Sequence, residues 1–86
     1  MLENPFNPNT VIDYSIMSDG FVEISVYDIL GRKVKDIINE HIESGNHSIV
    51  ISLEGLTSGM YFYNLKVHGI DGQFIYSSTK KMALIK

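Results

Sequence analysis

Alternation of apolar and polar positions is the main feature of this sequence. It is clearest over residues 59–67, where every second side chain is aromatic or aliphatic: Tyr61, Tyr63, Leu65 and Val67. A period of two with this composition predicts a β-strand that buries one face. Glycines at both ends of the segment mark its limits. We therefore expect this segment to be the strand around which the others are arranged.

The same period recurs in shorter runs along the chain. Further strands are expected at residues 10–16, 21–28, 47–53, 73–78 and 79–86. Residues 33–38 fit a helix or a strand, and we favour a strand because turns enclose the segment; residues 39–44 are polar and predict a loop. About seven short strands without a convincing helix predict an all-β fold, an immunoglobulin-like antiparallel β-sandwich.

Turn chemistry predicts how some of these segments connect. Residues 18–20 are expected to link strands 10–16 and 21–28 into an antiparallel hairpin, with Gly20 at positive φ. Asp28 is expected to cap the following turn through its side chain, with Gly31 in the left-handed conformation. Residues 1–9 contain two prolines and predict a linker segment, which leaves residues 10–86 for the sandwich.

Size and composition indicate one small globular domain spanning residues 1–86. The formal net charge is −3, with seven basic against ten acidic side chains, which argues against nucleic-acid binding. No apolar run approaches the roughly 20 residues that cross a bilayer, so we expect no direct membrane insertion. The chain has no cysteine and hence no disulfide.

No motif with catalytic or metal-binding spacing is found. The three histidines, His41, His47 and His68, do not fit a zinc site, and neither a G-x-S-x-G motif nor a P-loop occurs. A sandwich this small also has little volume for a catalytic cleft. We therefore expect no enzymatic activity, no catalytic or metal site and no cofactor.

The C-terminal segment stands apart because of its lysines at positions 80, 81 and 86. A chain that ends in a strand usually places it at a sheet edge. Edge lysines can prevent pairing with other chains, which is the interpretation that the residues alone favour. They can also be recognised by another protein through strand addition or charge. An exposed terminal strand further predicts some strand-exchanged homodimer in concentrated solution.

Five motifs, in this order, carry a resemblance to a known family. They are Asn4-Pro5-Phe6-Asn7-Pro8-x-Thr10, Val26-Tyr27-Asp28-x-Leu30-Gly31-Arg32-x-Val34, Gly45-x-His47, Leu56-x-Ser58-Gly59-Met60-Tyr61-Phe62-Tyr63-x-Leu65 and Thr79-Lys80-Lys81-Met82-x-Leu84-Ile85-Lys86. Together they resemble the type A C-terminal sorting domain of the type IX (Por) secretion system of the Bacteroidetes and related phyla. They are also similar to the immunoglobulin-like domain of the flagellar hook-capping family.

The resemblance implies a non-catalytic, seven-stranded signal domain at the end of an exported protein. Such domains direct an upstream cargo domain from the periplasm across the outer membrane, to the cell surface or beyond. Their partners are shuttle and sortase proteins of the outer membrane, and in many members the sortase removes the domain. Family signal information maps here to Gly59, Tyr61 and Tyr63 and to the tail, where the direct contacts are expected to be Lys80, Lys81, Leu84, Ile85 and Lys86. The motif residues expected to act structurally are Asn4, Pro5, Phe6, Pro8, Tyr27, Asp28, Gly31, Gly45, Gly59, Tyr61 and Tyr63.

Two other functions are compatible with the sequence. A structural or carbohydrate-binding accessory module of a larger secreted enzyme would need an exposed aromatic platform, for example from Phe21, Phe74 or Tyr76. A hook-capping relative would assemble with flagellar subunits. The exported parent that the resemblance implies favours sorting.

Overall fold

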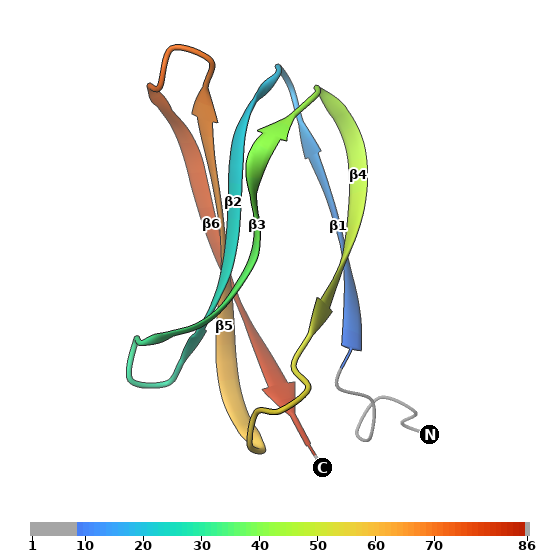
Figure 1. Ribbon diagram of the computed structural model, residues 1–86, viewed down its shortest axis with the longest axis vertical. Coiled ribbons are helices and arrows are strands. Elements are labelled where there is room, and N and C mark those ends of the chain that lie inside the picture. Colours follow the sequence, from blue (N-terminus) through green and yellow to red (C-terminus); the bar gives the residue numbers. More distant parts are fainter. Residues whose placement is uncertain (1–8, 86) are drawn as a thin grey trace.

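The computed structural model describes residues 9–85, which form six β-strands and no helix (Figure 1). The strands are β1 (Asn9–Ile16), β2 (Gly20–Asp28), β3 (Lys33–Ile42), β4 (Gly45–Ser52), β5 (Gly59–Gly69) and β6 (Phe74–Leu84). The predictions for Asn4, Pro5, Phe6, Pro8 and Lys86 lie outside the described residues. Within them there is no helix that could cross a membrane.

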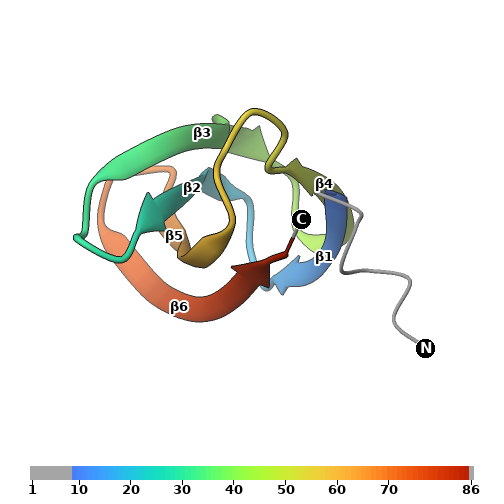
Figure 2. The same ribbon diagram turned by 90° about the horizontal axis from the view of Figure 1, so that it is seen from below.

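The strands form two antiparallel sheets. One has four strands in the order β3-β2-β5-β6, and the other pairs β1 with β4. Figure 2 shows the four-stranded sheet curving from β3 at the top to β6 at the bottom, with β1 and β4 side by side at the right. The all-β sandwich prediction is confirmed, and the number of described strands is six instead of about seven.

The core lies between the two sheets and is built from alternate residues. Strand β2 supplies Val22, Ile24 and Val26, none more than 1% exposed, and β4 supplies the fully buried Ile51. Strand β5 adds Tyr61, Leu65 and Val67, as its alternation predicted. Burying a side chain of this size contributes roughly 1.5–3 kcal/mol, so this shared apolar layer is what holds the sheets together.

The predicted hairpin of strands 10–16 and 21–28 is wrong. Strand β1 pairs with β4, whereas β2 pairs with β3 and β5. Both β1 and β2 carry one apolar face, and a sandwich buries such faces against each other. Residues 17–19 therefore carry the chain from one sheet to the other instead of closing a two-stranded ribbon.

Two strand boundaries also differ from the prediction. Residues 73–78 and 79–86 were expected as two strands, but Phe74–Leu84 is one strand, β6. Residues 39–44 were expected as a loop, but β3 continues to Ile42. Residues 39–42 and the centre of β6, residues 77–81, are polar because they belong to edge strands with mostly exposed side chains. Neither stretch contains the glycine or proline that would end a strand.

Gly20 is required for a different reason from the one predicted. It is not among the glycines with positive φ. It lies opposite Gly69, where β2 and β5 approach closely, and a Cβ added there would lie 2.4 Å from the His68 carbonyl oxygen. This position therefore excludes a side chain, whereas Gly31 does adopt the predicted left-handed conformation, with φ of 87°.

We expect Gly20→Ala to destabilise the domain by roughly 1–3 kcal/mol, because the new methyl group forces β2 away from β5. Urea unfolding followed by circular dichroism measures the change. Ser18→Ala in the exposed turn before β2 is the control and should unfold like the parent. Equal stability of Gly20→Ala and the parent would contradict the close approach.

Candidate functional site

The predicted recognition segment lies on β6, at one edge of the four-stranded sheet. Strand β6 pairs with β5 along its whole length, and no described strand pairs with its other edge. Lys80 lies opposite Tyr63 and Lys81 opposite Phe62. Because neighbouring residues of a strand point to opposite faces, the two lysines face opposite sides of the sheet. They therefore present charge to two surfaces and not to one.

The tail residues differ in exposure. Leu84 is 4% exposed and belongs to the core, where it lies opposite Gly59, whereas Ile85 is 54% exposed. Lys80 and Lys81 are exposed. The structure thus leaves Lys80, Lys81 and Ile85 accessible to a partner, while Leu84 fixes the end of β6 to the core.

The described lysines fall into two groups. The first group is engaged within the domain: Lys33 Nζ lies 3.1 Å from Asp36 Oδ1, and Lys35 Nζ donates to the Ser52 carbonyl at 2.7 Å. Hydrogen bonding with Asp36 raises the pKa of Lys33, and the same contact lowers the pKa of Asp36. The second group, Lys66, Lys80 and Lys81, makes no ion pair with any residue between 9 and 85.

The Asp28 turn between β2 and β3 is built as predicted. The Asp28 Oδ1 atom accepts hydrogen bonds from the Leu30 and Arg32 backbone N–H groups, both at 2.9 Å. Its Oδ2 lies 2.8 Å from Arg32 Nε. The Arg32 backbone N–H is the largest cause that lowers the pKa of Asp28. This network holds a turn whose apolar side chains point into solvent, because Ile29 and Leu30 are 69% and 75% exposed.

Tyr61 fixes the loop before β5. Its ring is 6% exposed, and its hydroxyl donates to the Thr57 carbonyl at 2.6 Å. Gly59 begins β5, and Tyr63 is half-buried on the inner face. Gly45, with φ of 126°, begins β4 where the chain crosses between sheets after β3.

Most of the family motifs meet at one end of the sandwich. The Asp28 turn and the loop before β5 line a shared depression of about 400 Å3 at the lower end in Figure 1, where β6 also finishes. Gly45 lies at the opposite end. Motif residues far apart in the sequence are thus gathered beside the predicted recognition segment.

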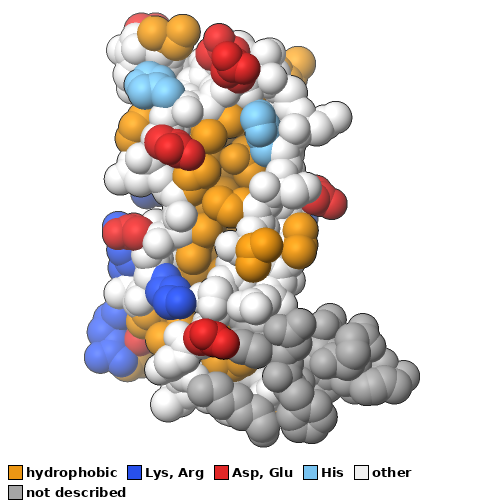
Figure 3. Space-filling view, turned by 45° about the vertical axis from the view of Figure 1, so that its right-hand side comes forward, with side chains coloured by type: hydrophobic (Ala, Val, Ile, Leu, Met, Phe, Trp, Pro, Cys, Tyr) orange, Lys and Arg blue, Asp and Glu red, His pale blue; other side chains and the backbone are white. Residues whose placement is uncertain are grey.

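The flank where β3 and β4 diverge is partly apolar. Figure 3 looks at this flank and shows hydrophobic side chains between two columns of polar ones. The half-buried isoleucines packed against the core include Ile37, Ile38, Ile42 and Ile49. Lys35 spans the flank by its bond to Ser52 of β4. Burial raises the pKa of Tyr14, and the charge of Glu40 on β3 adds to that rise.

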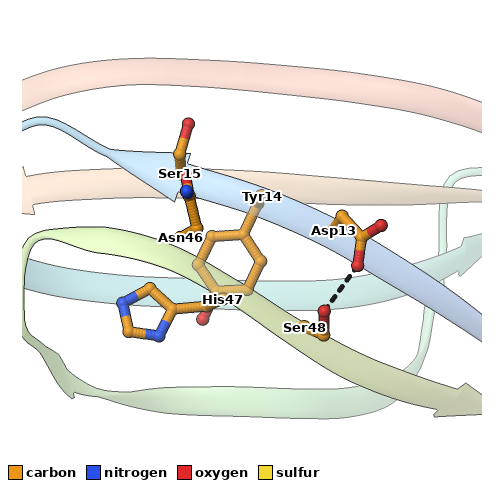
Figure 4. A pocket seen from close by; sticks show the side chains of 6 residues that line it. All are labelled: Asp13, Tyr14, Ser15, Asn46, His47 and Ser48. Carbon is orange, nitrogen blue, oxygen red and sulfur yellow. Dashed lines mark hydrogen bonds between the residues drawn. The ribbon is translucent and has the colours of Figure 1, made fainter.

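A depression of about 520 Å3 near β1 and β4 contains residue types found in catalytic sites, drawn in Figure 4. Tyr14 stacks on His47 with ring centroids 5.5 Å apart, and His47 Nε2 lies 2.7 Å from the Glu43 carbonyl oxygen. Ser48 donates its hydroxyl proton to Asp13 instead of bonding to His47. These side chains therefore do not form a serine–histidine–aspartate relay. Within residues 9–85, no group of three His, Asp or Glu side chains could hold a metal ion.

A family model described as the secretion system C-terminal sorting domain matches residues 4–72. The chain belongs to this family. The resemblance drawn from the motifs is thereby confirmed. Comparison with curated proteins and with solved structures gave no match. The matched range ends before β6, so the roles of Lys80, Lys81, Leu84 and Ile85 remain predictions.

Membership of this family indicates the general function of the domain. It is a C-terminal sorting signal for type IX secretion, in a family that is generally non-catalytic, and its parent is exported to the cell surface or extracellular space. A sorting domain implies an interaction with the type IX secretion machinery and an upstream cargo in the same protein. The opposite orientation of Lys80 and Lys81 was overlooked in the sequence, although their adjacent positions in a strand already predict it.

We expect Asp28→Asn to destabilise the sorting domain at neutral pH and to have less effect in acid. The folded pKa of Asp28 is lowered, so its contribution is complete above the unfolded value of about 3.9. It is lost as the pH falls through the folded value. Melting temperatures of parent and variant between pH 7 and pH 2.5 measure the difference. A difference that stays constant over this range would contradict the role of the charge.

Proposed function

We propose that the exposed part of β6 is the signal by which the secretion machinery recognises this domain. The observation that carries the proposal is an edge strand with two exposed lysines, Lys80 and Lys81, that form no ion pair among residues 9–85, followed directly by the exposed Ile85. Leu84 anchors that strand in the core. A predicted contact at Leu84 is therefore made through the strand position and not through its side chain. Lys86 is proposed to extend the same signal.

Strand addition is the mechanism that fits this geometry. An edge strand offers unpaired backbone N–H and C=O groups to an extended partner, and the side chains beside it give specificity. The proposed partners are the shuttle and sortase proteins of the outer membrane, which meet the domain after it reaches the periplasm with its cargo. Removal by the sortase would follow. The domain itself would bind no nucleic acid, insert into no membrane and catalyse no reaction.

The accessory-module alternative finds less support. Phe21 is half-buried and packs edge-on against His41, with ring centroids 5.3 Å apart. Phe74 lies opposite His68 and Tyr76 opposite Val67, because of the register shift in between. Phe74 and Tyr76 thus face opposite sides of β6. Of the candidate platform rings, Phe21 and Phe74 both lie opposite His68 on one face, and Tyr76 lies on the other. The edge-on packing of His41 on Phe21 and of His68 on Phe74 leaves less of either ring open to a sugar.

We expect the double substitution Lys80→Gln with Lys81→Gln to leave the cargo in the periplasm, while the fold is kept, because both side chains are exposed. The assay compares cargo in periplasmic and extracellular fractions of the secreting host. Lys80→Arg with Lys81→Arg is the matched control, since it keeps both charges. Deletion of residues 80–86 should also block export, but it removes the core residue Leu84 and so disturbs the fold.

Normal export of the folded double glutamine variant would refute recognition through these lysines. Ile85→Ser tests the apolar part of the same signal and should reduce export, because it removes an exposed apolar contact without touching the core.

We also propose that the free edge of β6 allows some homodimer to form by strand exchange at high concentration. Edge strands favour such pairing, and the exposed lysines oppose it only weakly at high salt. Sedimentation velocity over a rising protein concentration should show a dimer fraction that grows in 0.5 M salt. A single monomer boundary at all concentrations would rule the exchange out.

A further inference from the structure

A shallow depression of about 380 Å3 lies on the outer face of the four-stranded sheet. We call it the outer-face groove. Tyr27 and Phe62 lie opposite each other on β2 and β5, and both are half-buried. They point away from the core because their neighbours Val26 and Tyr61 point into it. Ile29 lines one rim, where the Asp28 turn keeps it exposed.

Two lysines, Lys66 and Lys81, lie at the groove. Lys81 lies opposite Phe62, and Lys66 lines the groove further along β5. Neither lysine forms an ion pair with a residue in the range 9–85. Glu23 lies opposite Lys66, but its carboxylate is directed to His68 Nε2, 3.8 Å away. Asp28 also lines the groove, but its carboxylate is bonded to Arg32 at 2.8 Å. Lys66 and Lys81, which have no ion pair among the described residues, therefore leave an excess of positive charge beside the aromatic rings in a chain of net charge −3.

We propose that the outer-face groove binds an extended acidic peptide segment of a partner protein. An apolar side chain of that segment would lie on Tyr27 and Phe62, and a carboxylate on either side of it would meet Lys66 and Lys81. This proposal deepens the proposed function and rests on it, since the partner would be a component of the secretion machinery.

A peptide fits the groove better than a glycan does. A small-molecule ligand such as a sugar is oriented by a few precisely placed polar groups. The Asp28 carboxylate lines the groove, but it already accepts from the Leu30 and Arg32 backbone N–H groups and from Arg32 Nε. Among the described residues that line the groove, the only side-chain amide is that of Asn64, whose Nδ2 already donates to Ser77 Oγ at 2.9 Å and to Thr79 Oγ1 at 2.8 Å. Thr79 lines the groove and belongs to β6, so an extended chain leaving the groove reaches the free strand edge directly. The groove and the edge then form one continuous surface.

The two lysines of β6 differ in their position relative to the groove. Lys81 faces the groove side of the sheet, and Lys80 faces the other side. A partner that pairs with the β6 edge meets Lys80 on one face of its own strand and Lys81 on the other.

The test is an NMR titration of the isotopically labelled domain with a blocked peptide of sequence Asp-Glu-Leu-Phe-Asp-Glu. We expect shift changes at the amides of residues 27–29, 62–66 and 79–81, and weaker binding as salt is raised. Lys81→Gln should weaken binding about threefold, the size of one exposed ion pair. Ser15→Glu lowers the net charge equally on the outer face of the other sheet, and it should bind like the parent.

Three results would contradict peptide binding in the outer-face groove. They are no binding, equal binding of a control peptide in which Asn and Gln replace Asp and Glu, and shift changes centred on β1 and β4. If a hyaluronan tetrasaccharide bound more strongly and shifted the same amides, the ligand of the groove would be an anionic glycan and the peptide proposal would be wrong. The export assay separates this inference from the proposed function. If Lys81→Gln lost export but bound the peptide as the parent does, the groove proposal would be wrong and the sorting role of β6 would stand. Failure of the double glutamine variant to affect export, with peptide binding present, would refute the sorting role of the lysines alone.

Discussion

The antiparallel pairing of β5 with β2 on one side and β6 on the other is the constraint on which the rest of the structure depends. Strand β5 contributes Tyr61, Leu65 and Val67 to the core, and its register sets which residues of β6 face inward. Because Gly59 lies opposite Leu84, the inner face of β6 ends in an apolar anchor. The same register places Phe62 beside Lys81 on the outer face. Core, edge and groove thus follow from one set of backbone hydrogen bonds.

The two edge strands of the four-stranded sheet, β3 and β6, differ in how their charged side chains are bonded. On β3, Lys35 donates to a backbone carbonyl of β4, and Asp36 is bonded to Ser25 and Lys33. These contacts engage Lys33, Lys35 and Asp36 of β3 within the domain. On β6, neither Lys80 nor Lys81 has a charged partner among the described residues. Since lysines on an edge oppose unwanted pairing while leaving the strand accessible, β6 suits regulated contact better than β3 does.

Hydrophobic alternation predicted most strands, because the period of two is a property of each segment alone. It did not predict which strands pair. The residues between Ile16 and Gly20 signal a reversal, but local turn chemistry is the same whether the next strand lies beside β1 or across the core from it. The single strand β6 was divided for a related reason: its central polar residues bond sideways to Asn64, a contact that no local pattern contains.

The candidate site could be predicted only in part, for the same physical reason. The motifs identified the family, and adjacent numbering already places Lys80 and Lys81 on opposite faces. The lack of an ion pair at Lys66 and Lys81 within the described residues depends instead on cross-strand register, which places Glu23 opposite Lys66 but 3.8 Å from His68 Nε2, and Asp36 beside Lys33. Whether a charged side chain has an ion-pair partner depends on its neighbours in space and not on its neighbours in sequence. The surface offered by this domain is therefore defined as much by the pairs that form elsewhere in the sheet as by the tail itself.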